Sequence, residues 1–311
     1  MRRRTALMFL TPLAALSLIG AGCGGGAKSS ETSGDTSASS TDPAAILGAV
    51  KAEDQTKPAK VAMDLGVTLV GQIDNPQAAA ILGNGPINVK LSGPYDPTAK
   101  SADMVFDLKA GKINLPGKLR MIDGKTAFVG LQDKWYSIPE SSLQSSTSKV
   151  ATDPGATLTA LGNPADLLDN AKVVGGETIE GIATDHVSGD LNLDKLAAAM
   201  ERMSKSTSTA ASQAESVAKL KEAVKSGTVD VWVGQDDKQV HRMKLDLDVA
   251  IPTESQKTSM GVTGAKIVLT LQSTPVSSVS VSAPSGALTM QQFQNDLLTV
   301  IMSNLGSTTA P

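Results

Sequence analysis

The stretch VAMDLGVTL, residues 61–69, decides the fold, because its apolar residues alternate strictly with polar or small ones. One side of the alternation carries an aliphatic stripe made of Val61, Met63, Leu65, Val67 and Leu69. The other side carries Ala62, Asp64, Gly66 and Thr68. A period of two over nine residues predicts a β-strand with one covered face and one wet face.

The same period recurs along the chain. Two further stripes follow closely and comprise Val89 and Leu91, then Met104, Phe106 and Leu108. Later strands are predicted around residues 113–121, 127–131, 229–233, 243–249, 267–271 and 279–281, and Asp123-Gly124 is a hairpin signal. Regular short strands separated by turn signals predict an α+β fold built on one large antiparallel sheet, with helices as the cover of its apolar face.

Four helical segments accompany the strands. Asp42-Pro43 combines an N-cap residue with a proline at the first helical position, and Ile46, Leu47 and Val50 then share one face. A second helix is predicted over residues 156–171, a helical crossover over 192–226, and an amphipathic helix over Leu288–Leu305.

The N-terminus carries an export signal. Three arginines, Arg2 to Arg4, precede an apolar run from Ala6 to Ile19, and Gly20-Ala21-Gly22 leads to Cys23. This arrangement resembles the lipobox of bacterial lipoproteins, which implies that Cys23 takes a diacylglyceryl group and becomes the mature N-terminus. The alternative is an ordinary signal peptide with an incidental cysteine. Cys23 is the only cysteine, so it has no partner for an intrachain disulfide.

Composition divides the chain into a signal peptide (1–22), a lipidated flexible tether (23–41), a single domain (42–285, with the crossover inside it) and a C-terminal helix and tail (286–311). Loss of the signal removes three arginines and takes the net charge from -3 to -6. An acidic protein is poorly suited to nucleic acid, and lipid chains rather than charge would hold it at a membrane.

The chain lacks the motifs of common catalytic sites. It has no P-loop and no dinucleotide-binding glycine fingerprint, and its two histidines, His186 and His241, are too few for a typical zinc site. His186 lies on a predicted strand and is interpreted as a hydrogen-bonded structural residue, and Asp236-Asp237 as a hairpin turn. The sequence therefore predicts a protein without metal, cofactor or enzymatic activity.

Three segments carry a family resemblance. They are DGKTAFVGLQDKWY (residues 123–136), GGETIEGIATDHVSGDLNLDKL (175–196) and VDVWVGQDDKQVHRMKLDLDV (229–249). Together they resemble the LppX/LprA/LprF/LprG family of actinobacterial lipoproteins, whose fold is similar to that of the carrier LolA. The resemblance spans residues 42–284 and implies a half-barrel sheet wrapped around helices, with an apolar cavity for acyl chains.

Two functions remain open from the sequence. The first is a lipoprotein on the extracytoplasmic face of the cell membrane that binds lipid or glycolipid acyl chains. Envelope lipid transport is the role considered for such a protein. Its candidate cavity lining is the aliphatic set Val61, Met63, Leu65, Val67, Leu69, Val89, Leu91, Met104, Phe106 and Leu108. The second is a non-enzymatic envelope scaffold with a solid core, which dense packing makes the default for any single apolar residue.

Overall fold

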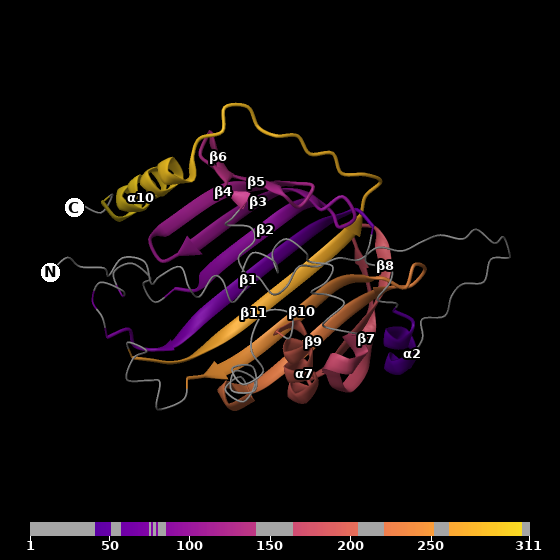
Figure 1. Cartoon of the computed structure of the whole chain (residues 1–311). Helices are drawn as coiled ribbons and strands as arrows, with labels where there is room; N and C mark the ends of the chain where they lie inside the picture. Colours follow the sequence, from indigo (N-terminus) through magenta and orange to yellow (C-terminus); the bar gives the residue numbers. More distant parts are fainter. Residues whose placement is uncertain are drawn as a thin grey trace.

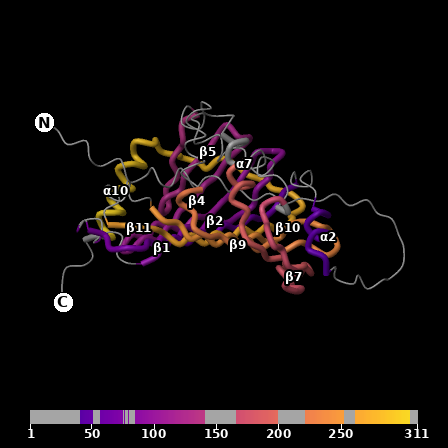
Figure 2. The backbone as a smooth tube through the Cα atoms, turned by 90° about the horizontal axis from the view of Figure 1, so that it is seen from below, coloured from indigo at the N-terminus to yellow at the C-terminus, as the bar shows by residue number. Residues whose placement is uncertain are grey.

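The computed structural model describes residues 41–50, 57–74, 76, 79, 85–140, 164–204, 221–251 and 261–306. Eleven strands form one sheet in the order β6-β5-β4-β3-β2-β1-β11-β10-β9-β8-β7, and every neighbouring pair is antiparallel. The sheet is open, and Figures 1 and 2 together show that it is bent rather than flat. The predicted class, a large curved antiparallel sheet with helices, is confirmed.

The strands divide into two meanders. The first meander comprises β1 (Ala59–Gly71), β2 (Ile87–Asp96), β3 (Ser101–Ala110), β4 (Ile113–Ile122), β5 (Thr126–Leu131) and β6 (Lys134–Ile138). The second comprises β7 (Leu168–Ile179), β8 (Ile182–Leu191), β9 (Val224–Gly234), β10 (Val240–Ala250) and β11 (Val262–Pro275).

The two meanders are joined by the pairing of the first strand with the last. β1 runs antiparallel to β11 along thirteen register positions, from Ala59 opposite Pro275 to Gly71 opposite Val262. This pairing places residues about two hundred positions apart side by side at the centre of the sheet (Figure 1).

One face of the sheet is apolar from edge to edge, and we call it the inner face. The register places Met63 opposite Leu91 on β2 and opposite Leu271 on β11. The same row continues through Phe106 on β3 and Met243 on β10. The opposite, outer face carries the intervening polar residues, among them Asp64 in an ion pair with Lys90. The alternation in the sequence thus becomes the two faces of the sheet.

Helices cover the two flanks of the inner face. On one flank, α2 (Pro43–Gly48) and α7 (Leu193–Ser204), with the 3-10 turn η3 (Pro164–Leu167), pack on β7 to β9. Asp42 caps α2 through its Oδ1, which accepts from the Ala44 amide at 3.0 Å, and Pro43 opens the helix as predicted.

On the other flank, α10 (Met290–Gly306) packs on β4 and β6 through Phe293, Leu297 and Val300. The helix begins with a capping box, because Thr289 and Gln292 exchange hydrogen bonds between side chain and backbone. Just before it, Leu288 bridges to Tyr136 and continues the edge of the sheet beyond β6.

A polar contact secures α10 to the sheet. The Asp296 carboxylate accepts from the Tyr136 hydroxyl at 2.6 Å and from Lys134 Nζ at 3.0 Å. Burial and the hydrogen bond to Asp296 raise the pKa of Tyr136 to about 12. The Phe293 ring meets the Tyr136 ring edge-on, with centroids 5.3 Å apart. Apolar packing and this contact therefore hold the same part of the helix.

Replacement of Asp296 by alanine is expected to loosen α10, because it leaves the buried Tyr136 hydroxyl without its acceptor. Amide hydrogen exchange in α10 should accelerate about tenfold, and the Tyr136 pKa, followed by ultraviolet titration, should fall toward its usual value. Gln294→Ala, at an exposed position on the same helix, is the control. Equal exchange in both variants would contradict the role assigned to Asp296.

Three elements differ from the sequence prediction. The helical crossover expected over residues 192–226 is wrong at its end, because Val224 already begins strand β9. The helix expected over residues 156–171 is absent from the described part of that range: Pro164–Leu167 forms one 3-10 turn, and Leu168 already pairs with Leu191 in the β7–β8 hairpin. The strand expected at residues 279–281 is not a strand. At residues 168–171 pairing with β8 decided the outcome over the local helical pattern, whereas residues 279–281 have the alternation of a strand but no strand partner.

Candidate functional site

All ten predicted lining residues lie on the inner face. The register aligns Met63 with Leu91 and Phe106, and Leu65 with Val89 and Leu108, in adjacent rows. Val61 and Met104 belong to one packed cluster, while Val67 and Leu69 continue the stripe on β1. The sequence pattern thus identified one contiguous apolar surface across three strands.

Burial divides these ten residues into two groups. Val61, Leu65 and Met104 are buried and belong to the packed core. The other seven are only partly buried, and they are Met63, Val67, Leu69, Val89, Leu91, Phe106 and Leu108. A solid core is densely packed, so it would not leave so many neighbouring apolar side chains partly exposed.

The exposure rises from one end of the sheet to the other. Where β1 begins, Ala59, Val61 and Tyr95 are all at most 9% exposed and form a packed cluster with their neighbours; we call this the closed end. Where β1 ends, Val262 is buried, but six large apolar residues are partly exposed, and they are Val67, Leu69, Ile87, Ile113, Leu247 and Ile267. We call that region the open end.

The sequence analysis missed the half of this surface that β10 and β11 contribute. Leu269 and Leu271 are buried beside Leu65, and Met243, Leu245 and Ile267 pack around them. Their alternation was visible in the sequence, but nothing local indicated that β11 pairs with β1. The middle of the inner face therefore extends across β2, β1, β11 and β10.

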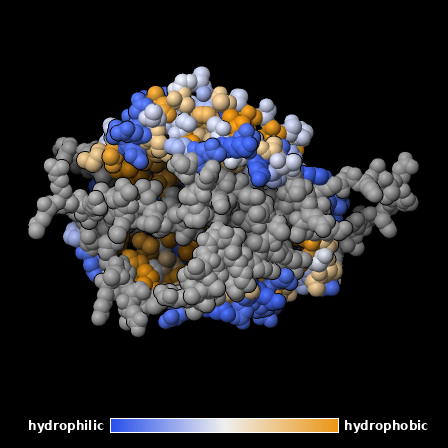
Figure 3. Space-filling model, viewed as in Figure 1, coloured by the Kyte–Doolittle hydropathy of each residue, from blue (hydrophilic) through white to orange (hydrophobic). Residues whose placement is uncertain are grey.

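This middle region lies between the two helix-covered flanks. Within the described part of the chain, no helical residue belongs to its apolar cluster, whereas both flanking clusters include helical residues. The space-filling view shows apolar surface in hollows between the residues drawn in grey (Figure 3). The candidate site is thus a wide aliphatic floor with few aromatic residues, of the kind that suits flexible hydrocarbon.

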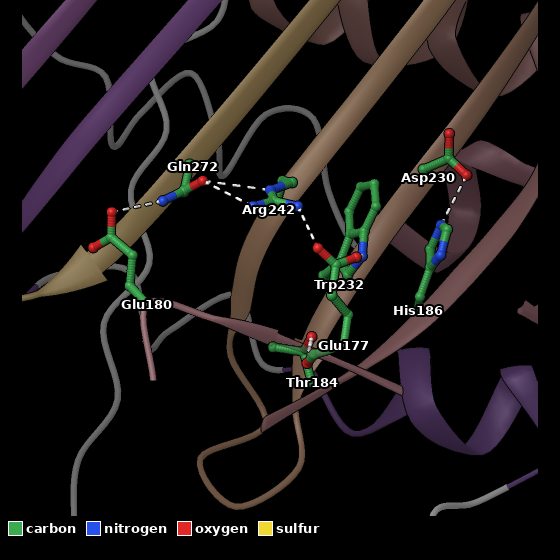
Figure 4. A network of polar contacts seen from close by, with 8 residues as sticks. All are labelled: Glu177, Glu180, Thr184, His186, Asp230, Trp232, Arg242 and Gln272. Carbon is green, nitrogen blue, oxygen red and sulfur yellow. Dashed lines mark hydrogen bonds and ion pairs between the residues drawn. The ribbon is translucent and has the colours of Figure 1, made fainter. Parts of the chain in front are cut away.

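The outer face carries a polar network with a structural role (Figure 4). The Glu177 carboxylate accepts from Trp232 Nε1 at 2.7 Å and from Arg242 Nη1 at 2.9 Å. The hydrogen bond from Trp232, assisted by Arg242, lowers the pKa of Glu177 despite partial desolvation. Glu180, at the hairpin turn, accepts from Gln272 and Thr274. These contacts attach the β7–β8 hairpin to the outer face of β9, β10 and β11.

His186 belongs to this network, and it is hydrogen-bonded on a strand, as the sequence predicted. Its ring stacks on Trp232 with centroids 4.2 Å apart, and its Nε2 lies 2.9 Å from the Asp230 carboxylate. Both partners come from β9, the strand next to β8. The histidine is therefore a structural residue of the outer face, at a distance from the apolar floor.

His241 forms a second, buried pair near the closed end. Its Nε2 lies 2.9 Å from Asp237 and its Nδ1 lies 3.3 Å from the Ser273 carbonyl oxygen. Burial disfavours the charged imidazole, but the hydrogen bond and the charge of Asp237 prevail and raise the pKa of His241. Asp237 lies in the predicted turn between β9 and β10. The pair fixes this turn at the edge of the inner face.

The described residues also bear on metal binding and on membrane-spanning helices. Among residues 41–306 that the structure describes, no group of three potential ligands could hold a metal ion. In the same residues no helix combines the length and the hydropathy that a membrane crossing requires. Cys23, the signal peptide and the tether lie outside the described residues.

Comparisons with known proteins bear on the fold alone. No protein-family model and no curated protein matches the chain. Solved structures that match include Mycobacterium tuberculosis lipoprotein LppX, at 17% identity and a TM-score of 0.37, and LprF from Mycobacterium bovis, at 12% and 0.39. The matches cover 78% and 80% of this chain and the whole of each of those chains.

A putative outer membrane lipoprotein-sorting protein domain from Vibrio parahaemolyticus matches at 6% identity and a TM-score of 0.20, over 82% of this chain and 95% of that one. The chain is thus similar to LppX and LprF over most of its length, at low identity and low TM-score.

Proposed function

We propose that the protein binds acyl chains of a lipid or glycolipid on the inner face of its sheet. The observation that carries the proposal is the group of seven partly buried residues, six aliphatic and one aromatic, on the inner face of β1, β2 and β3. Helices cover the flanks on both sides of this part of the sheet. Leu69, at the open end, marks where a chain enters, and the packed cluster around Val61 and Tyr95 marks where it stops.

The energetics favour a hydrocarbon ligand over a polar one. Each methylene moved from water onto such a surface contributes about 0.8 kcal/mol, so a long chain binds without any specific polar contact. Both ring nitrogens of His241 face oxygen atoms, and Nε2 of His186 faces the Asp230 carboxylate on the outer face, away from the apolar floor. Binding rather than catalysis is the chemistry that this surface supports.

The proposal includes the location. Lipidation of Cys23 would anchor the mature chain to the extracytoplasmic face of the cell membrane, and the tether 23–41 would leave the domain free to turn there. Transfer of lipid within the envelope is the role that suits a membrane-anchored carrier of this kind.

Val67→Trp is expected to lower lipid occupancy several-fold, because the indole fills the floor beside Leu65 and Ile267. The matched control is Thr68→Trp, since Thr68 is the next residue of β1 and is exposed on the outer face. Native mass spectrometry measures occupancy in the purified protein, then after delipidation and reloading with phosphatidylglycerol. Circular dichroism confirms that both variants fold.

Loss of lipid in Val67→Trp alone supports an inner-face site. Equal occupancy in both variants places the lipid elsewhere. A protein that neither co-purifies with lipid nor reloads it, and whose inner face is filled by its own side chains, leaves the scaffold interpretation in its place.

A further inference from the structure

We infer that α10 docks the domain on a lipid bilayer and brings the open end of the inner face to the lipid surface. The inference rests on the proposed function, because a docking surface beside an acyl-binding face serves the entry and exit of lipid. It adds a second site, on the outside of the molecule, that the lipid-binding face itself does not require.

The outward side of α10 is the first observation. Leu298 and Met302 are 61% and 66% exposed, although Phe293, Leu297 and Val300 of the same helix pack on the sheet. The exposed pair is one helical turn apart, so the two side chains form a continuous apolar stripe. Of the large hydrophobic residues exposed in the described chain, no two others lie on one helix.

The position of the stripe is the second observation. Near the end of α10, Asn304 Nδ2 donates to the Asn114 carbonyl oxygen at 3.2 Å. Asn114 follows Ile113 at the start of β4, and Ile113 is one of the partly exposed residues of the open end. Figure 1 shows α10 at this end of the first meander. The apolar stripe is therefore next to the opening of the candidate lipid site.

The charge around the stripe favours a bilayer as its occupant. Asp296 is the single charged residue of α10, and Tyr136 and Lys134 hold it against the sheet. The neighbouring β3–β4 turn presents Lys112, which is exposed. An apolar stripe beside a cation suits the interface of a membrane with anionic headgroups. Since the mature chain is acidic overall, apolar contact must provide most of the attraction.

The length of the tether agrees with this orientation. Figure 1 places α2, where the tether joins the domain, at the opposite end of the molecule from α10. β1 has thirteen residues, so the sheet is about 40 Å long. The eighteen residues 24–41, which follow Cys23, would reach roughly 60 Å when fully extended. An anchored chain can therefore lie along the membrane with α10 in contact with it.

The test compares two exposed apolar positions in the membrane-anchored full-length protein. Met302→Cys and Val174→Cys are each labelled with an environment-sensitive fluorophore; Val174 is 62% exposed on the edge strand β7. The protein is reconstituted in vesicles of phosphatidylethanolamine and phosphatidylglycerol that carry brominated acyl chains. We expect strong quenching and a blue shift at position 302 and little change at position 174.

A second measurement connects docking to loading. The double variant Leu298→Gln/Met302→Gln should take up pyrene-labelled phosphatidylglycerol from vesicles about tenfold more slowly, because two apolar contacts with the bilayer are lost. Its loading from detergent micelles should equal that of the unmodified protein. If loading fails from both sources in the unmodified protein, the proposed function is wrong, while the quenching experiment still decides the docking.

Absence of quenching at position 302 overturns the inference, as does equal quenching at both positions, which would indicate non-specific adsorption. Protection of position 302 in intact cells without quenching in vesicles would assign the stripe to a protein partner and overturn it as well.

Discussion

Gly93→Ala is expected to destabilise the domain by about 3 kcal/mol or more, because a side chain at this position meets backbone that cannot move away. A Cβ at Gly93 would lie 2.2 Å from the Asp103 carbonyl oxygen and 2.9 Å from the Met104 Cα. The backbone φ of +155° adds a further strain. Relief would require β2 and β3 to separate.

The position of Gly93 explains why the effect should be large. The β2–β3 pairing runs to Ser92 opposite Val105 and resumes in the same register with Tyr95 opposite Ala102, so Gly93 lies within the paired strands. Tyr95, Ala102 and Met104 belong to the packed cluster of the closed end. A shift of the backbone at this point therefore disturbs the core that terminates the proposed lipid site.

Gly66→Ala is the matched control. Gly66 lies on the adjacent strand β1, and a Cβ there would have ordinary contacts of 3.5 Å to Asn88 Oδ1 and 4.0 Å to the Val268 carbonyl oxygen. Since glycine in a strand loses more conformational freedom than alanine, this variant should be unchanged or slightly more stable, by about 0.5 kcal/mol. Urea denaturation of both variants measures the difference. Similar midpoints would show that the backbone of Asp103 and Met104 does not lie against Gly93 as closely as the structure shows.

The local pattern of the sequence predicted most of the strands of the sheet. The alternation of residues 61–69 became β1 with its apolar side inward, and Asp123-Gly124 became the β4–β5 turn. These predictions succeed because a period of two and a turn signal depend on neighbours in the chain. The ten candidate lining residues share a face for the same reason.

Properties that depend on long-range contacts were not predictable. The β1–β11 pairing joins segments that no local signal relates, so the β10 and β11 half of the apolar floor was missed. The same holds for the helix expected over residues 156–171, where the 3-10 turn Pro164–Leu167 is followed directly by strand β7 in the structure. In α10, Leu298 is exposed although its neighbour Leu297 packs on the sheet, and the amphipathic pattern of residues 288–305 alone did not separate the two.

The His241–Asp237 pair leads to the second large prediction. Both ring nitrogens of His241 face oxygen atoms that can only accept, the Asp237 carboxylate and the Ser273 carbonyl, so the doubly protonated ring satisfies both. Gly234 lies against the pair, since a Cβ there would be 2.0 Å from Asp237 Oδ1 and 2.8 Å from His241 Nε2. The turn therefore favours the charged form of His241 and raises its pKa.

Asp237→Asn is expected to destabilise the domain by about 2 kcal/mol at pH 5.5, since it leaves the buried imidazolium without its counter-charge. The loss is smaller than the roughly 3–5 kcal/mol of fully buried pairs, because 32% of the Asp237 side chain is exposed. Asp236→Asn, at the exposed neighbouring position of the same turn, should change stability little.

The pH dependence distinguishes this pair from an ordinary hydrogen bond. Because folding raises the pKa of His241, its contribution is complete below the usual value of 6.5 and is lost as the pH rises through the folded value. For Asp237, burial acts against the charge, but the hydrogen bond from His241 lowers the pKa, so its contribution is present above 3.8 and is lost as the pH falls through the folded value.

The difference in unfolding free energy between the unmodified protein and Asp237→Asn should therefore be greatest between about pH 4 and pH 6.5. It should shrink as the pH rises through the folded pKa of His241. Urea denaturation at pH 5.5 and at pH 9 measures it. A difference that stays constant across this range would mean that His241 is neutral in the folded protein, and the turn would then depend on hydrogen bonding alone.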